Sequence, residues 1–211
     1  TDTTTLPDTI ALSIVWNGTL ATVSGDAGDS VSISQGATAG DVVITSTTQR
    51  YLQLSVSGTG SDGSLLVYSN RMWGLVFNGI TRNNPDGPAI NNQCSKALYL
   101  TLADGTTNSL TDGTTYAERS YDQKGTLFSE GQIYFQGKGT LNVSGNCKNG
   151  IASDDYIVFQ DGTVSVSVSE TGTNGIKVND GFTMEGGTLA IGVTAPGARG
   201  IRSEARTTFS G

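Results

Sequence analysis

A short block of residues returns at a fixed interval near the C-terminal end of the sequence. Gly150-Ile151-Ala152-Ser153, Gly175-Ile176-Lys177-Val178 and Gly200-Ile201-Arg202-Ser203 begin 25 residues apart. The hydrophobic residues between the blocks keep the same phase, so that Phe159 corresponds to Met184. A repeat of roughly 20 to 50 residues is typical of solenoids, propellers and related arrays. The sequence therefore predicts stacked copies of one structural unit.

The length of the repeat and its hydrophobic pattern favour one kind of array. A propeller blade needs roughly 40 residues or more, whereas one turn of a β-helix needs fewer. Residues 164–168 alternate strictly between hydrophobic and polar side chains, and no helical periodicity is sustained over three turns. Earlier copies of the repeat align back to about residue 125, and more loosely before it. We predict an all-β, single-stranded parallel β-helix, a three-sided solenoid with about 24–25 residues per turn.

The sequence contains no linker, and we expect a single domain over residues 1–211. Within it we expect a flexible tether at residues 1–9 and an inserted loop at residues 112–124, and we expect the array to continue past residue 211. The Asn-Gly pairs at 149–150 and 174–175 are predicted to turn sharp corners, because both residue types tolerate a positive φ. Four bulky side chains are expected to close the first turn: Trp16, Tyr51, Met72 and Trp73.

Charge and composition exclude several classes of function. The chain has 12 basic and 19 acidic residues, a net charge of −7, and no histidine. Without a basic stripe it is not expected to bind nucleic acid, and without histidine it lacks the usual nucleophilic triads.

Composition also bears on location. No run of 18 apolar residues could span a membrane, and the Thr, Ser, Asn and Gly content favours an exported protein. We expect an extracellular or cell-surface monomer, and attachment to an outer membrane or a lipid anchor is compatible with this. A disulfide between Cys94 and Cys147 is disfavoured, because the two cysteines fall at different points of the turn.

Two segments resemble a known family. One is residues 86–113, which contain Leu-Ala-Asp-Gly-Thr-Thr-Asn at 102–108, and the other is residues 139–153. They resemble the carbohydrate-binding β-helix family typified by a protein of a cellulosome-producing Clostridium and common in secreted Bacteroides proteins, and the resemblance covers about residues 20–211. It implies a right-handed parallel β-helix related in shape to pectate lyases, with bound calcium and affinity for cellulose or polygalacturonate. It implies no established catalysis.

Outward positions that follow each Gly-Ile pair form a strip rich in oxygen ligands. Carboxylates on adjacent turns, about 4.8 Å apart, can bracket Ca²⁺, which takes six to eight oxygen ligands. An acidic protein that binds an acidic polymer needs such a bridge, because the bare charges repel each other. The alternative is a solvated surface of ion pairs that contribute little. The candidate calcium ligands are Glu130, Asp154, Asp155, Asp180 and Glu204.

Two kinds of side chain could contact a sugar. Cations in a column beside the carboxylates could hold a uronate carboxylate, and tyrosine rings can stack on the apolar face of a sugar. The tyrosines have alternatives: those in the inserted loop could form a lid over the core, and those on strands could reflect β-propensity alone. The candidate carbohydrate-binding residues are Lys177, Arg202, Tyr116, Tyr121, Tyr134 and Tyr156.

Together with the resemblance, these patterns favour a non-catalytic extracellular protein. We expect it to bind a plant cell-wall polysaccharide, such as pectin, polygalacturonate or cellulose, with the help of calcium. No catalytic residue is assigned. Two alternatives remain: a calcium-dependent, pectate-lyase-like enzyme that uses Arg202 as its base, and an adhesin-like stalk whose rigidity is its function.

Overall fold

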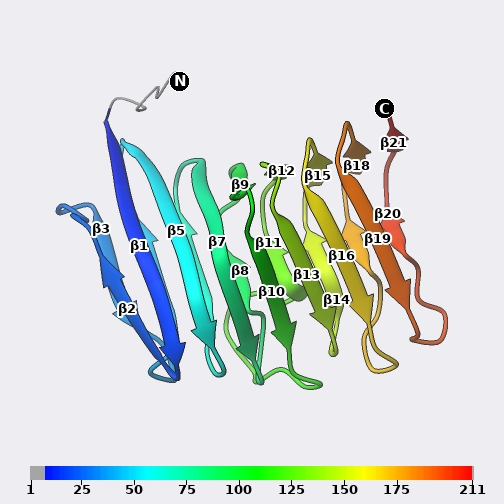
Figure 1. The fold of residues 1–211 in the computed structure, drawn as a ribbon, viewed down its shortest axis with the longest axis horizontal. Helices are drawn as coiled ribbons and strands as arrows, with labels where there is room; N and C mark the ends of the chain where they lie inside the picture. The colour runs from blue at the N-terminus through cyan, green and yellow to red at the C-terminus, as the bar shows by residue number, and fades with distance from the viewer. Residues whose placement is uncertain (1–7, 211) are drawn as a thin grey trace.

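The computed structural model describes residues 8–210, which form an elongated stack of β-strands (Figure 1). Successive turns of the chain lie side by side from the N-terminal end to the C-terminal end. Residues 8–210 contain no helix, so the predicted all-β class is confirmed. No helix that could cross a membrane is found among them. The predicted tether falls mostly on residues 1–7, which lie outside the described residues, and Thr9 already begins β1 (Thr9–Gly18).

The solenoid has three faces, each a ladder of parallel strands. The first face contains the starts of β5 (Tyr51–Gly60) and β7 (Trp73–Asn84), followed by β9 (Leu98–Leu102), β12 (Ile133–Gln136), β15 (Tyr156–Phe159), β18 (Gly181–Met184) and β21 (Thr207–Phe209). The second face contains the ends of β5 and β7, followed by β10 (Thr107–Asp112), β13 (Thr140–Gly145), β16 (Thr163–Val168) and β19 (Thr188–Val193). The third face contains β4 (Val42–Ser46), β6 (Leu65–Ser69), β8 (Ile90–Asn92), β11 (Gly125–Ser129), β14 (Asn149–Ser153), β17 (Ile176–Val178) and β20 (Ile201–Ser203). The predicted three-sided parallel β-helix is therefore confirmed.

Strand register follows the sequence repeat. Ile151 pairs with Ile176, and Ile176 pairs with Ile201, so the three blocks stack directly on one another. Ile151 and Ile176 are fully buried, whereas Ile201, in β20, is partly buried. On the first face Phe135 stacks on Phe159, with ring centroids 4.3 Å apart and planes inclined by 3°. The inward ladder of large apolar side chains is what holds the turns together.

The glycines of the repeat do not have the role that the sequence suggested. Gly150 lies within β14 and Gly175 directly precedes β17, and neither has a positive φ. A Cβ on Gly175 would lie 2.3 Å from Ile191 Cγ2 and 2.5 Å from the carbonyl oxygen of Gly200. The prediction of sharp corners here was wrong, because the glycines are needed where the third face approaches the second. Positive φ occurs instead at glycines such as Gly162 (+97°) and Gly187 (+77°), where the chain passes from the first face to the second.

The asparagines beside these glycines form a ladder of side-chain hydrogen bonds. Asn149 Nδ2 donates to the carbonyl oxygen of Lys124 at 2.7 Å, and Asn174 Nδ2 donates to Asn149 Oδ1 at 3.0 Å. The backbone N–H of Arg199 continues the ladder by donating to Asn174 Oδ1 at 3.2 Å. Both asparagines are buried, so these bonds satisfy polar groups that water does not reach.

The N-terminal end is closed by two antiparallel pairs. β1 pairs with β2 (Leu20–Ser24), and β3 (Val31–Gln35) pairs with β4. Trp16 of β1 is buried as expected, and its indole N–H donates to the carbonyl oxygen of Gly40 at 2.7 Å. The expectation for the other three bulky residues was wrong: Trp73 is buried in a later turn, Met72 is exposed, and Tyr51 lies on the outer surface. Cys94 and Cys147 are both free thiols.

Candidate functional site

The candidate site lies along one edge of the solenoid, where each turn passes from the third face to the first. We call this edge the charged corner. The register pairs the first inward residues of the first-face strands with one another, so the residues two positions before them share one column. From the N-terminal end, this column contains Arg50, Arg71, Lys96, Gly131, Asp155 and Asp180. The corner is therefore basic over three turns and acidic over later ones.

Carboxylates of the acidic half occupy two neighbouring columns. The backbone N–H of Asp154 donates to Ser129 at 3.0 Å and that of Glu204 donates to Val178 at 3.1 Å, which continues the third-face ladder into the corner. Glu130, Asp154 and Glu204 consequently share one column, with Asn179 on the intervening turn. Asp155 and Asp180 lie one position further along. The five candidate calcium ligands thus lie along a single edge, as two adjacent columns.

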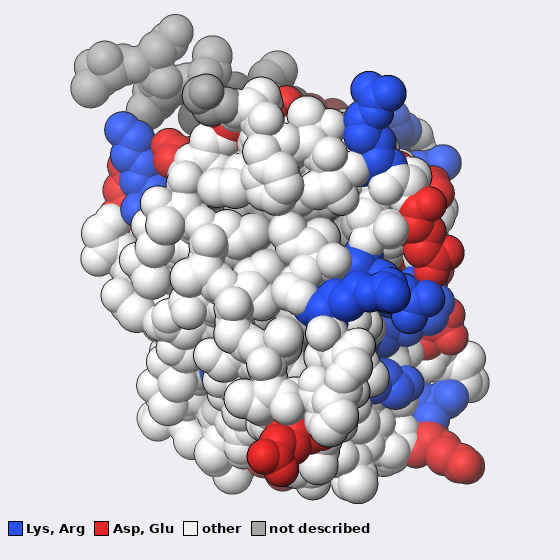
Figure 2. Space-filling model, turned by 90° about the vertical axis from the view of Figure 1, so that its right-hand side faces the viewer, with Lys and Arg blue, Asp and Glu red and all other residues white. Residues whose placement is uncertain are grey.

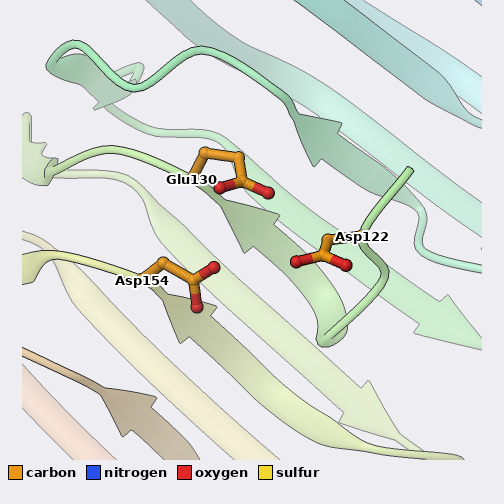
Figure 3. Close-up of side chains that lie close together, drawn as sticks. All are labelled: Asp122, Glu130 and Asp154. Atoms are coloured by element: carbon orange, nitrogen blue, oxygen red, sulfur yellow. The ribbon is translucent and has the colours of Figure 1, made fainter.

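Only part of this strip forms a tight cluster. Asp122 lies close to Glu130 and Asp154, and one carboxylate oxygen of each of the three residues lies within 4.8 Å of the others. In Figure 3 Asp122 comes from the loop before β11, Glu130 follows β11 and Asp154 follows β14. We call these three residues the acidic cluster. Sequence reasoning missed Asp122, because the repeat pattern does not predict how the segment between β10 and β11 folds back.

A lysine ammonium neutralises part of the acidic cluster. Lys124 Nζ lies 2.7 Å from Asp122 Oδ2 and also contacts Asp154 Oδ2. Glu130 has no such partner among the described ion pairs. Burial, followed by the negative charge of Asp154, raises the pKa of the Glu130 carboxyl above its usual range. Three carboxylates against one ammonium leave the cluster with an excess of negative charge, which is an environment that favours a hard divalent cation.

Towards the C-terminal end the charges of the strip pair with one another. Lys177 Nζ lies 2.6 Å from Asn179 Oδ1 and 3.5 Å from Glu204 Oε1, and Arg202 Nη2 lies 3.7 Å from Glu204 Oε1. Figure 2 shows charged residues of both signs gathered along one side of this end, while most of the end is uncharged. Asp155 accepts a hydrogen bond from Gln132, and burial, then the charge of Asp180, raises the pKa of its carboxyl. Here the strip matches the alternative of a solvated surface with mutual ion pairs.

The tyrosines of the first face form a longer array than the two predicted from sequence. Tyr134 and Tyr156 share a hydroxyl hydrogen bond, and their rings are perpendicular at a centroid distance of 5.8 Å. Tyr99 stacks on Tyr134 at 5.1 Å with planes inclined by 16°. Tyr51 lies over Gly74, and its hydroxyl is only 2.5 Å from the position that a Cβ on that glycine would occupy. We call Tyr51, Tyr99, Tyr134 and Tyr156 the tyrosine strip.

Sequence reasoning missed Tyr51 and Tyr99 for a specific reason. Tyr99 lies between Leu98 and Leu100, just as Tyr134 lies between Ile133 and Phe135, and the two segments pair in register. Tyr99 therefore shows the same alternation of inward and outward residues as Tyr134. The inserted loop separates the two segments by more than one repeat, so their correspondence is not visible from the 25-residue period.

The loop tyrosines are held against the body of the solenoid. The hydroxyl of Tyr116 donates to Asp112 Oδ2 at 2.5 Å, and Lys148 Nζ lies 5.4 Å from the centre of its ring. Burial is the main reason that the pKa of Tyr116 is raised, and the neighbouring Asp112 adds to it. These contacts favour the lid alternative for Tyr116. Tyr121 is half-buried and lines a small cleft beside the charged pair Arg119 and Asp86, away from the tyrosine strip.

Comparison with known proteins places this geometry in a family. A sequence profile described as "Carbohydrate-binding domain-containing protein" matches residues 38–210. The chain belongs to this family. No match was found among curated proteins. The fold is similar to that of a solved structure, the polysaccharide lyase-like protein from C. thermocellum in a gadolinium derivative, with 21% identity and a TM-score of 0.65 over 95% of this chain and 97% of the other. The resemblance to a carbohydrate-binding β-helix family is thus confirmed.

Proposed function

We propose that the protein binds a polysaccharide along the tyrosine strip and does not cleave it. The observation that carries this proposal is the alignment of Tyr99 and Tyr134, whose rings stack at 5.1 Å in the middle of the strip. Tyr51 and Tyr156 extend the array on either side of them. Membership of a carbohydrate-binding family agrees with this role.

The geometry of the strip suits a polymer better than a single sugar. Strands of one face lie about 4.8 Å apart, so tyrosines on several turns offer repeated contacts along the solenoid axis. Tyr99 and Tyr134 cover one face of each other, so each offers a polymer its remaining ring surface and a hydroxyl for hydrogen bonding. All four tyrosines are partly exposed, and they lie on the outer side of a sheet and not in a closed cavity. An open platform accepts the middle of a long chain without needing an end.

Calcium is proposed to assist at the acidic cluster. Asp122, Glu130 and Asp154 offer carboxylate oxygens close enough to share one ion, and Ca²⁺ prefers such ligands. The ion would have to displace the ammonium of Lys124. A bound cation would reduce repulsion between an acidic polymer and a chain of net charge −7.

The lyase alternative gains no specific support from this geometry. Its proposed base, Arg202, lies beside Glu204 in the last described turn of the third face, two turns from Asp154. The stalk alternative explains the repeat but not the tyrosine strip. We therefore retain extracellular polysaccharide binding by a monomer as the proposed function, with plant cell-wall glycans such as pectin or cellulose as the class to test first.

The test is glycan binding by a variant that lacks the centre of the strip. Tyr99→Ala combined with Tyr134→Ala is expected to weaken binding to any retained polysaccharide by at least tenfold, since each stacked ring is worth about 1 kcal/mol or more. Tyr68→Ala, on the third face, is the matched control and should bind like the parent. Affinity electrophoresis in gels containing each polysaccharide measures the effect. Unchanged migration of the double variant would refute the proposal.

A further inference from the structure

A groove lies at the basic half of the charged corner. It has a volume of about 620 Å³ and is lined by residues at or just before the starts of β5, β7, β9 and β12. Arg50, Arg71 and Lys96 each contribute a cation to it from three successive turns. Among the described residues that line the groove, none is acidic. We call it the basic groove.

The cations of the basic groove are less neutralised than the others along this corner. Lys124 and Lys177 contact carboxylates, whereas among residues 8–210 neither Arg71 nor Lys96 forms an ion pair. Arg50 pairs with Asp8 at 2.7 Å, but the side chain of Asp8 is 75% exposed. Arg71 is oriented by a hydrogen bond from its guanidinium to Gln49.

Stacking three like charges has an energetic cost. Like charges on directly opposed strand positions are destabilising, and adjacent turns are only about 4.8 Å apart. Acidic residues outnumber basic ones in this chain, so a column of three cations without interleaved carboxylates runs against its composition. An anion bound in the groove would relieve the repulsion. A guanidinium presents paired N–H donors that match a carboxylate or a sulfate.

The basic groove is continuous with the tyrosine strip. Tyr51 belongs to both, and Tyr99 follows Lys96 by three residues on the same turn. Met72, 53% exposed, adds an apolar contact surface inside the groove. A sugar that stacks on Tyr51 or Tyr99 would therefore place its ring substituents beside Arg71 and Lys96.

From this arrangement we infer that the basic groove binds the oxyanion of a charged sugar residue, a carboxylate or a sulfate ester, directly and without a metal ion. The inference rests on the proposed function, since the sugar is held by the tyrosine strip. It separates two modes of anion recognition along one corner. The basic groove acts through its own cations, whereas the acidic cluster would act only through calcium. Gly131 marks the boundary between them in the corner column.

The experiment compares charged and neutral glycans in the presence of EDTA. Fluorescently labelled oligogalacturonate, its carboxyl-reduced form and a sulfated dextran oligomer are titrated with the parent and with Arg71→Gln combined with Lys96→Gln. The double variant is expected to lose about tenfold or more in affinity for the oxyanion glycans, a typical effect for charge-assisted hydrogen bonds. Its affinity for the carboxyl-reduced oligomer should not change. The two charged ligands distinguish a carboxylate from a sulfate as the preferred group.

A matched control separates local recognition from net charge. Lys138→Gln combined with Arg206→Gln removes the same charge from two exposed cations outside the groove. An equal loss of affinity in this control would overturn the inference, as would parent protein that binds charged and reduced oligomers equally well in EDTA. Because like-charge repulsion is relieved, the groove variant should unfold at a temperature no lower than the parent, so misfolding cannot account for its lost affinity.

The result also distinguishes the inference from the proposed function. If Tyr99→Ala with Tyr134→Ala abolishes binding and the groove variant has no effect, the platform stands and the basic groove is refuted. If only the groove variant weakens binding, anion recognition stands and stacking on the tyrosine strip is refuted. Parent protein that binds neither charged nor neutral oligomers refutes both.

Discussion

Replacing Gly175 by alanine tests why glycine recurs in the 25-residue block. The added Cβ would lie 2.3 Å from Ile191 Cγ2 on the second face and 2.5 Å from the backbone oxygen of Gly200 on the next turn of the third face, so both neighbours must move away. Overpacking of this kind costs about 1–3 kcal/mol. Loss of glycine flexibility in the unfolded chain offsets about 0.4–1 kcal/mol of that cost. The expected net loss is about 1–2 kcal/mol, which corresponds to a melting temperature lower by about 2–8 °C for a chain of this size.

The same column supplies the control. Among residues 8–210, the atoms nearest to a Cβ on Gly200 would lie 3.9 Å away, and neither glycine has a positive φ that alanine would strain. Gly200→Ala is therefore expected to leave the melting temperature unchanged or to raise it by a few degrees at most, about 4 °C. Both are measured by circular dichroism during heating and by urea unfolding. Equal stability of the two variants would refute the close approach of the faces as the reason for the glycine.

Three further predictions concern the corner and its ladders. Lys124→Gln should raise the affinity for Ca²⁺, because the competing ammonium is removed, whereas Asp122→Asn should lower it. Calorimetric titration with CaCl₂ measures both affinities. A titration that releases no heat in either variant would argue against the site. The pKa of Glu130 is raised in the folded state, so its contribution to stability is present below the usual carboxyl range and is lost as the pH rises through the raised pKa. Without calcium, Glu130→Gln should therefore melt at the same temperature as the parent in acid and at a higher temperature at neutral pH. A difference in melting temperature that does not depend on pH would contradict this. Asn149→Ala should lose about 2 kcal/mol in urea unfolding, because it leaves the buried Asn174 Nδ2 without its acceptor and removes one of the two bonds to the carbonyl oxygen of Lys124. Asn142→Ala on the exposed side of β13 should lose little.

The sequence predicted the inward side of the solenoid well for a physical reason. Ile151, Ile176 and Ile201 must each fill the same position of the core, so burial preserves both the spacing and the kind of residue. The same constraint places Phe135 on Phe159 in register. Stacked turns contact mainly their neighbours, so a period in sequence becomes a period in space.

Outward positions and loops were less predictable because no packing constraint repeats there. Asp122 reaches Glu130 and Asp154 from a segment that has no counterpart in other turns. Tyr51 extends the tyrosine strip by leaning over Gly74, a contact set by the absence of a side chain on the next turn. The role of Gly175 was also misjudged, since the sequence shows that a glycine recurs but not whether φ or space requires it.

Charge along the corner column gives the platform a direction. A polymer lying on the tyrosine strip would pass Arg71 and Lys96 at one end and Asp155 at the other, because all three share one column. A neutral chain has no reason to prefer either orientation on stacked rings. An anionic chain without calcium is drawn to the basic end and repelled from the acidic end, so its bound length should be shortest in EDTA. Calcium at the acidic cluster would remove that repulsion, and longer oligomers should then gain more affinity from calcium than short ones that reach only the basic groove.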